Sequence, residues 1–192
     1  IHLNPLQELA QPEGDRNWIG VLAALRDLVK RADVPIMVKE VGAGISVRTA
    51  KQLLDQGVEI IDIAGLGGTN WTRIEQHRSD PLRQEIMAPF LDWGIPTVDA
   101  LKAVRAEATQ AMIIASGGVR HGLDIARCLW LGADIASAAG VFIKALEDEN
   151  NTLRPERLDV LLSVWKEQLK TAMFLTASKT LKALKTADGE VL

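Results

Sequence analysis

The sequence predicts an α/β fold in which parallel strands and helices alternate. Short apolar segments are separated by amphipathic segments of helical length, a pattern typical of repeated βαβ units. The segments 60–64 and 135–139 are each preceded by a glycine and followed by small residues at the same spacing. One repeated βα unit favours a closed barrel over a doubly wound sheet, and about four or five strands are too few for a complete barrel. We therefore expect the C-terminal half to two-thirds of a (β/α)8 TIM barrel.

The first half of the chain contains two predicted strands with a helix between them. Residues 34–41 form the first strand, Ser46 caps the helix that follows, and Gly57 ends that helix. Residues 60–64 form the second strand. The segment 66–96 is polar and predicts a long loop.

The second half repeats this alternation. Thr97 is predicted to cap a helix, and residues 112–115 form the next strand. A helix over 123–131 leads to a last strand over 135–139. The tail over 155–192 is expected to be helical, because leucines and a tryptophan recur on one stripe.

Composition sets the size and environment of this fold. The chain has 192 residues, 47% of them apolar and 24% charged, so we expect one domain over residues 1–192. A net charge of −3 gives no reason to expect nucleic acid as a partner, and no apolar run approaches a membrane span. The single cysteine, Cys128, and the absence of a basic and apolar leader favour a cytoplasmic protein.

The start of the chain adds a further expectation. It begins at Ile1, and residues 1–4 resemble the end of a strand that is already under way. We therefore expect a barrel domain that is incomplete at its N-terminus and whose missing N-terminal half is a partner. A half-barrel would expose two sheet edges and an apolar interior, which favours association.

Lys39 lies near the end of a strand that we expect to be covered on both faces. An unpaired buried ammonium is costly, so it needs an anionic partner. Neighbouring strand residues point to opposite faces, which argues against Glu40 as that partner. Two interpretations stay open: an ion pair with another acid, or contact with a ligand at the C-terminal edge of the sheet, where barrel enzymes have their active sites.

Two glycine-rich turns follow predicted strands. Residues 116–120 read Ser-Gly-Gly-Val-Arg, and residues 65–70 read Gly-Leu-Gly-Gly-Thr-Asn. The first turn precedes a helix, and backbone N–H groups at a helix N-terminus bind anions, most often phosphate. Together the turns predict a phosphate-bearing ligand at one edge of the sheet. Either turn alone is also compatible with an ordinary βα connection.

A polar cluster follows the N-terminal strand stub and contains His2, Asn4, Gln7 and Glu8. Mg²⁺ takes one or two protein oxygens and completes its shell with water and substrate phosphate. Glu8 with these neutral neighbours is therefore a candidate magnesium site. The same residues would also suit an ordinary polar loop.

Taken together, these motifs resemble those of the type 2 isopentenyl-diphosphate isomerases, a family of flavin-dependent (β/α)8 barrels. The resemblance extends from residue 1 to about residue 175. The motifs that carry it, in chain order, are His-Leu-Asn-Pro-Leu-Gln-Glu (2–8), Gln-Pro-Glu-Gly-Asp-Arg-Asn (11–17), Val-Lys-Glu-Val-Gly (38–42), Asp-Ile-Ala-Gly-Leu-Gly-Gly-Thr-Asn (62–70) and Ala-Ser-Gly-Gly-Val-Arg (115–120).

This resemblance implies that isopentenyl and dimethylallyl diphosphates are interconverted by a 1,3-proton shift. Reduced FMN would supply the acid/base chemistry, Mg²⁺ would bind the diphosphate, and NADPH would reduce the flavin. The resemblance implies that Gln7 is the catalytic residue at the reacting end of the substrate, that His2 and Asn4 line its diphosphate side, and that Glu8 binds the metal. It also implies a homo-oligomer. The FMN contacts it implies are Lys39, Thr69, Gly118, Val119, Arg120, Ala139 and Gly140.

Two departures from the family pattern matter. Ala64 stands where many members have a serine that contacts the flavin, so we expect one hydrogen bond to be lost. The N-terminal half of the family pattern is absent, so we expect the chain alone to be inactive and to bind FMN weakly. Two alternatives stay open: another FMN-dependent barrel oxidoreductase, and a non-catalytic half-barrel. The oxidoreductase would need a base, for which His77 and His121 are candidates, although both are expected on the surface.

Overall fold

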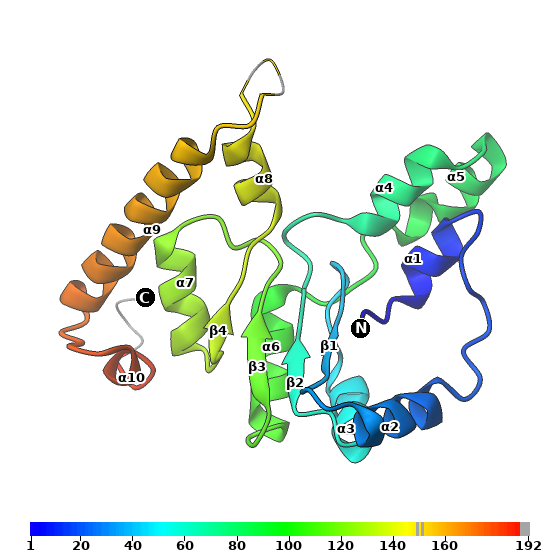
Figure 1. The fold of residues 1–192 in the computed structure, drawn as a ribbon, viewed down its shortest axis with the longest axis horizontal. Helices are drawn as coiled ribbons and strands as arrows, with labels where there is room; N and C mark the ends of the chain where they lie inside the picture. The colour runs from blue at the N-terminus through cyan, green and yellow to red at the C-terminus, as the bar shows by residue number, and fades with distance from the viewer. Residues whose placement is uncertain (149, 151, 189–192) are drawn as a thin grey trace.

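A four-stranded parallel sheet lies at the centre of the computed structural model, which describes residues 1–148, 150 and 152–188 (Figure 1). The strands follow one another in the sheet in chain order, β1-β2-β3-β4. A doubly wound sheet reverses its strand order at a switch point, whereas a barrel adds each strand on the same side of the last. The observed order is that of a barrel. The strands are β1 (Met37–Lys39), β2 (Ile60–Asp62), β3 (Met112–Ala115) and β4 (Ile135–Ala136).

Helices connect the strands, as the alternation in the sequence predicts. The connecting helices are α3 (Val47–Asp55), α6 (Thr97–Glu107) and α7 (Gly122–Trp130), and α2 (Val21–Arg31) precedes β1. As predicted, Ser46 caps α3, accepting a hydrogen bond from the N–H of Thr49 at 3.1 Å. The other helices are α1 (Pro5–Ala10), α4 (Trp71–Arg78), α5 (Pro81–Met87), the 3-10 helix η1 (Ala88–Phe90), α8 (Gly140–Leu146), α9 (Pro155–Leu175) and α10 (Leu181–Leu184).

The N-terminal residues pair with the edge of the sheet, which confirms the predicted strand stub. The N–H of Leu3 donates to the carbonyl of Lys39 at 3.0 Å, and the N–H of Lys39 donates to the carbonyl of Ile1 at 2.9 Å. His2 and Lys39 form a parallel bridge. The stub therefore lies beside β1 and brings the start of α1 near the end of that strand.

The helices bury one face of the sheet. Val38, Ile61 and Ile113 alternate onto that face, are fully buried, and join one cluster with helix residues such as Leu53 and Leu101.

The opposite face is partly open. Met112 and Ile135 on it remain 44% and 45% exposed. Lys39 lies on the same face, because it alternates with the buried Val38. The expectation that the Lys39 strand is covered on both faces is therefore wrong within the described residues.

The predicted loop over 66–96 is wrong, because α4, α5 and η1 lie within it. Asn70 caps α4, and Asp80 caps α5 with Pro81 at the first helical position. The polar composition of these helices hid them from the periodicity argument.

Thr97 does not cap α6. It is the first residue of that helix, and its hydroxyl donates instead to the carbonyl of Gly117 at 2.6 Å. This hydrogen bond ties the start of α6 to the glycine turn after β3.

The strands are shorter than predicted. The sheet pairs only three residues of the predicted strand 34–41 and only two of 135–139. Ile135, predicted to be buried, is half-exposed because β4 lies at the edge of the described sheet.

The helical tail is confirmed over α9 and α10, whereas residues 189–192 lie outside the described residues. Trp165 on α9 is buried, and its ring lies 5.1 Å from that of Phe142 on α8. Within the described part of the chain, no helix combines the length and apolarity needed to cross a membrane.

Candidate functional site

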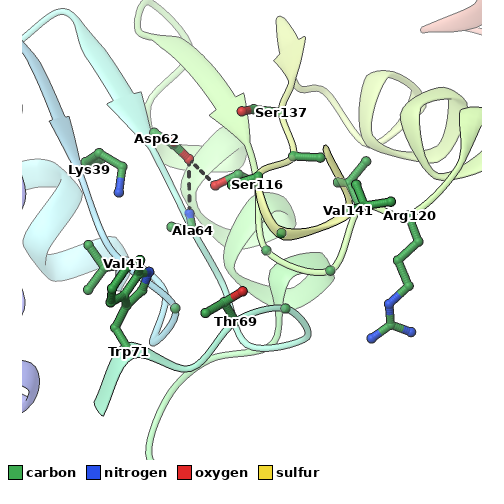
Figure 2. Close-up of a pocket in the computed structure, with 18 of the residues that line it drawn as sticks. Lys39, Val41, Asp62, Ala64, Thr69, Trp71, Ser116, Arg120, Ser137 and Val141 are labelled. Atoms are coloured by element: carbon green, nitrogen blue, oxygen red, sulfur yellow. Dashed lines mark hydrogen bonds between the residues drawn. The ribbon is translucent and has the colours of Figure 1, made fainter. Parts of the chain in front are cut away.

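The C-terminal ends of the four strands surround a cavity of about 580 Å³ (Figure 2). Because parallel strands end at one edge, the turns that follow them converge there. The resemblance assigns seven residues to cofactor binding, and all of them line this single cavity: Lys39, Thr69, Gly118, Val119, Arg120, Ala139 and Gly140. Their role in FMN binding stays a prediction.

The two glycine turns meet backbone to backbone at the cavity floor. Gly117 and Gly118 have φ of +95° and +82°, in the left-handed region that favours glycine. A Cβ on Gly118 would lie 2.7 Å from the carbonyl oxygen of Gly67, closer than such atoms can approach. Glycine is therefore required for the two turns to touch.

The turn after β3 lines the cavity and, among the described residues, contains backbone donors without a partner. Within the described residues, the N–H groups of Gly118 and Val119 donate to no protein acceptor. The N–H of Arg120 is already used, because it donates to Oδ2 of Asp124 at 3.0 Å. The Arg120 side chain donates to the carbonyl of Gly67 at 2.8 Å and joins the two turns. The turn therefore offers an anion two free N–H groups.

Asp62 and Ser116 form a hydrogen-bonded pair in the cavity wall that the sequence argument missed. Oδ1 of Asp62 accepts from the Ser116 hydroxyl at 2.6 Å and from the N–H of Ala64 at 3.2 Å (Figure 2). Ala64 has φ of +37°, unusual for a residue with a side chain. An acid within an apolar strand was the available signal for this pair, since a buried carboxylate needs partners.

Burial raises the pKa of the Asp62 carboxyl. The hydrogen bonds from Ser116 and Ala64 lower this pKa, as does the positive charge of Lys39, but by less. The Lys39 ammonium donates to the carbonyl of Glu40 at 2.6 Å and lies in register with Asp62 on the next strand. Asp62 is therefore the acid across the sheet whose charge interacts with Lys39.

Glu40 is not a side-chain partner of Lys39, as predicted. Its Oε2 accepts from the backbone N–H groups of Val41, Gly42 and Ala43 at 2.7, 3.0 and 2.7 Å. Burial raises its pKa, although these three donors and the Asn4 side chain lower it. The carboxylate thus fixes the turn after β1.

Trp71 is a second residue that the sequence argument did not assign. It begins α4, lines the cavity and remains 44% exposed. Figure 2 shows it on the same side of the cavity as Lys39. It supplies the cavity with an aromatic surface.

The predicted substrate and metal residues lie outside this cavity, on the stub and α1. Asn4 caps α1, because its Oδ1 accepts from the N–H of Gln7 at 2.8 Å. Oε2 of Glu8 accepts from the N–H of Asp15 at 2.9 Å, and its Oε1 lies 3.8 Å from Nε2 of His2. The structure therefore gathers His2, Asn4, Gln7 and Glu8, but in a separate group.

Gln7 is the outlier in this group. Its Oε1 is buried and accepts no hydrogen bond within the described residues. No cluster of three or more histidine, cysteine or acidic side chains suited to a metal occurs in the described part of the chain. Any Mg²⁺ bound by Glu8 would need oxygens from water and a ligand.

The two histidines considered as bases do not line the cavity. His77 is exposed near the end of α4, as predicted. His121 has a structural partner that was not foreseen: its Nδ1 accepts from the N–H of Asp124 at 3.2 Å and caps α7. Neither is placed as a base.

A second cavity, of about 720 Å³, lies between α1, α2, α3 and residues 90–95. Aromatic and aliphatic side chains dominate its lining, including Trp18, Phe90 and Trp93. Of the predicted site residues it contains Asn4 alone.

The parallel strand order, with glycine turns at the C-terminal edge of the sheet, is the architecture of part of a (β/α)8 barrel. The sequence pattern of the FMN-dependent dehydrogenase family matches residues 11–189, and the chain belongs to that family. The crystal structure of mandelate oxidase with benzoyl-formic acid has a TM-score of 0.65 to this chain at 17% identity. The superposition covers 87% of this chain and 42% of the oxidase chain. The structural similarity confirms the predicted fold class.

Within this family, the chain is similar to curated isopentenyl-diphosphate delta-isomerases. The protein of that name from Rickettsia bellii (strain RML369-C) is 45% identical over 189 residues, which are 98% of this chain and 54% of the relative. The one from Rickettsia africae (strain ESF-5) is 44% identical over the same shares. The chain spans about half the length of the curated relatives that it matches.

Proposed function

We propose that the chain forms the C-terminal half of an FMN-dependent isomerase that interconverts isopentenyl and dimethylallyl diphosphates. The observation that carries this proposal is the identity of 45% with isopentenyl-diphosphate delta-isomerase, which extends over 98% of the chain. The gathering of seven candidate cofactor residues in one cavity supports it.

Several features of the cavity support FMN as its ligand. Its volume of about 580 Å³ falls in the range of cofactor pockets. The free N–H groups of Gly118 and Val119 suit the FMN phosphate, together with the backbone at Ala139 and Gly140. Lys39 and Thr69 would contact the rest of the cofactor. Reduced FMN, when bound, supplies the acid/base chemistry of the proton shift.

The chain's own residues bind and orient the substrate in this proposal. The buried, unpaired Oε1 of Gln7 offers an acceptor for the reacting end of the substrate. Glu8 would hold Mg²⁺ on the diphosphate, and the neighbouring His2 and Asn4 would line that side. NADPH is proposed as the reductant of the flavin.

We also propose that the chain acts only together with an N-terminal half. The sheet face that carries Met112 and Ile135 is open in the described residues, and closing the barrel would cover it. The complete protein is proposed to be a cytoplasmic homo-oligomer. The chain alone is expected to bind FMN weakly and to be inactive.

Deuterium incorporation tests the proposal directly. The chain is supplied with FMN, NADPH, Mg²⁺ and isopentenyl diphosphate in D₂O, alone and mixed with the N-terminal half of the Rickettsia bellii isomerase. We expect deuterated dimethylallyl diphosphate from the mixture only. Glu8→Gln should lower this activity in a way that added Mg²⁺ partly restores, whereas the surface change His77→Gln should leave it unchanged.

The same mixture separates the alternatives. If the mixture binds FMN, catalyses no proton exchange into isopentenyl diphosphate, and has its flavin reduced by a 2-hydroxy acid, the protein is an oxidoreductase instead. If the mixture binds no FMN, the interpretation that remains is a non-catalytic half-barrel.

A further inference from the structure

Asp62 has no role in the proposed function, yet its carboxylate forms part of the cavity wall. The residue is 6% exposed and lies at the end of β2. Its Oδ1 accepts both of its hydrogen bonds, from Ser116 and Ala64. Within the described residues, Oδ2 accepts no hydrogen bond from the protein, and it is not among the fully enclosed polar atoms that lack a partner. A mostly buried carboxylate that lines a cavity and has one oxygen free of protein partners is available to a ligand or to a neighbouring charge.

The charge opposite Asp62 is the Lys39 ammonium. The two residues are register partners on β1 and β2 and lie on the same face of the sheet. The other charged side chains of the cavity are Arg120, in the turn after β3, and Lys144, on α8; Figure 2 shows Arg120 directed away from Asp62. Glu40 is engaged by backbone N–H groups. Asp62 is thus the carboxylate that faces Lys39 across the sheet, and the two interact through charge without an ion pair within 4 Å.

We propose that Asp62 is a positioning residue of the cavity: it orients the Ser116 hydroxyl through Oδ1 and, as an anion, provides the negative charge that faces the Lys39 ammonium across the sheet. This inference rests on the proposed function, because the ligand that these groups receive is taken to be FMN.

The proposal specifies the chemistry of the ligand at this end of the cavity. The Ser116 hydroxyl gives its hydrogen to Asp62, so its oxygen offers the cavity only lone pairs. Lys39 gives one hydrogen to Glu40 and retains two donors. A ligand that presents an N–H to Ser116 and a carbonyl or ring nitrogen to Lys39 satisfies both. A heterocycle with adjacent amide groups has this pattern, and the flavin ring is one.

The first experiment needs no flavin. The Asp62 carboxyl is titrated by ¹³C NMR in the chain and in Lys39→Met and Ser116→Ala variants. Because Lys39 and Ser116 both lower the Asp62 pKa, each variant should raise its titration midpoint above that of the parent chain. Lys144→Met, which removes another lysine of the same cavity, should leave the midpoint unchanged. Equal midpoints in all four proteins would overturn the proposal.

The second experiment uses the assembled protein that contains both halves. It distinguishes the effect of the Asp62 charge from the effect of its hydrogen bonds. Asp62→Asn retains an oxygen for Ser116 and Ala64 but removes the charge, whereas Asp62→Ala removes both. Reduced FMN carries an additional negative charge on its ring, so the unbalanced Lys39 of Asp62→Asn should favour it over oxidised FMN. We expect at least a tenfold change in the ratio of the two dissociation constants, or about 30 mV in the two-electron potential. Asp62→Ala should in addition weaken binding of oxidised FMN about tenfold.

The control for this experiment is Asp134→Asn, which removes a carboxylate at the opposite end of the sheet and should leave the ratio unchanged. An Asp62→Asn protein with the parent ratio would overturn the proposal. If the parent protein binds no FMN, the proposed function fails, and the titration still decides whether the Asp62 carboxyl interacts with Lys39 and Ser116.

Discussion

Gln7 is a residue whose burial is not explained by the fold. Its Oε1 is enclosed and accepts no hydrogen bond within the described residues, whereas its backbone N–H is satisfied by Asn4. Leaving a buried acceptor unpaired costs about 1–3 kcal/mol. Such a cost at a candidate site is consistent with a group that is held ready for a ligand.

Replacing Gln7 tests this interpretation. Gln7→Met keeps the side-chain volume and removes the unpaired acceptor, so the free energy of unfolding should stay unchanged or rise by about 1 kcal/mol. Isomerisation by the assembled protein should be lost. Urea denaturation measures the first effect and deuterium incorporation the second. Asn4→Ala, which removes a helix cap, should instead cost about 1 kcal/mol. A clearly destabilised Gln7→Met chain would show that the amide serves the fold.

At the scale of single residues, the sequence predicted the glycine turns best and the side-chain hydrogen bonds least. The turns after β2 and β3 were recognisable because only glycine suits their backbone. Asp62 and Ser116 were missed because their partnership joins two strands that are 54 positions apart. A contact of that kind depends on strand register, which the residue pattern did not specify.

At the scale of elements, the segment between β2 and α6 supports α1. The Ser79 hydroxyl donates to the carbonyl of Ala10 at 2.9 Å, and Arg83 donates to the carbonyl of Leu9 at 2.5 Å. Both carbonyls lie in the last turn of α1, where helix carbonyls lack partners within the helix. The position of Gln7 and Glu8 therefore depends on a segment that was predicted to be a loop.

Ser79→Ala should loosen α1 selectively. A buried carbonyl then loses one donor, which costs about 1 kcal/mol. Amide hydrogen exchange should accelerate in α1. It should remain unchanged in α7, to which Ser79 makes no hydrogen bond within the described residues. Thr171→Ala on α9 removes a hydroxyl that also donates to a helix carbonyl but lies on the surface, and it serves as the control. Uniform acceleration in both helices would indicate global destabilisation instead.

The errors at this scale have a common physical cause. Helices α4 and α5 are recognisable by their caps, Asn70 and Asp80, more than by any apolar stripe. The strand ends were overextended because apolar residues continue past the last paired positions. Periodicity reports burial, whereas the ends of an element depend on hydrogen bonds.

At the scale of the whole molecule, an ion cluster closes the N-terminal end of the sheet. Arg105 donates to Asp134 and to the carbonyl of Gly132, at 2.5 and 2.7 Å, and Lys185 donates to Asp134 at 3.0 Å. Burial alone would raise the Asp134 pKa, but the N–H of Ile113 and the two cations lower it below its ordinary value. In (β/α)8 barrels, the N-terminal end of the sheet contributes to stability, whereas the active site lies at the C-terminal end.

The cluster predicts how stability depends on pH. A carboxyl whose pKa is lowered on folding stabilises above its unfolded pKa, and that stabilisation is lost as the pH falls through the folded pKa. Asp134→Asn should therefore cost about 0.5–1 kcal/mol at neutral pH, since the group is partly exposed. The difference from the parent chain should shrink as the pH falls below the ordinary aspartate pKa of about 4. Urea midpoints at pH 7 and pH 3 measure this, and a difference that grows in acid would contradict it.

The open face of the sheet predicts association. Met112 and Ile135 project from it and are 44% and 45% exposed. Met112→Lys should therefore reduce self-association of the chain and its binding to an N-terminal half, while leaving the opposite, buried face intact. Light scattering measures the first effect and co-elution the second. The solvent-side change Lys102→Met should have no such effect, and a Met112→Lys chain that associates like the parent would place the interface elsewhere.

The contact between the glycine turns also determines how the cavity can change. With no side chain between Gly67 and Gly118, neither turn can shift without displacing the other, and Arg120 adds a further link. The floor of the cavity therefore behaves as a single rigid piece shared by β2 and β3. Adaptation of this pocket to another ligand must then come from its walls, at positions such as Trp71, Ser137 and Val141, and not from its floor.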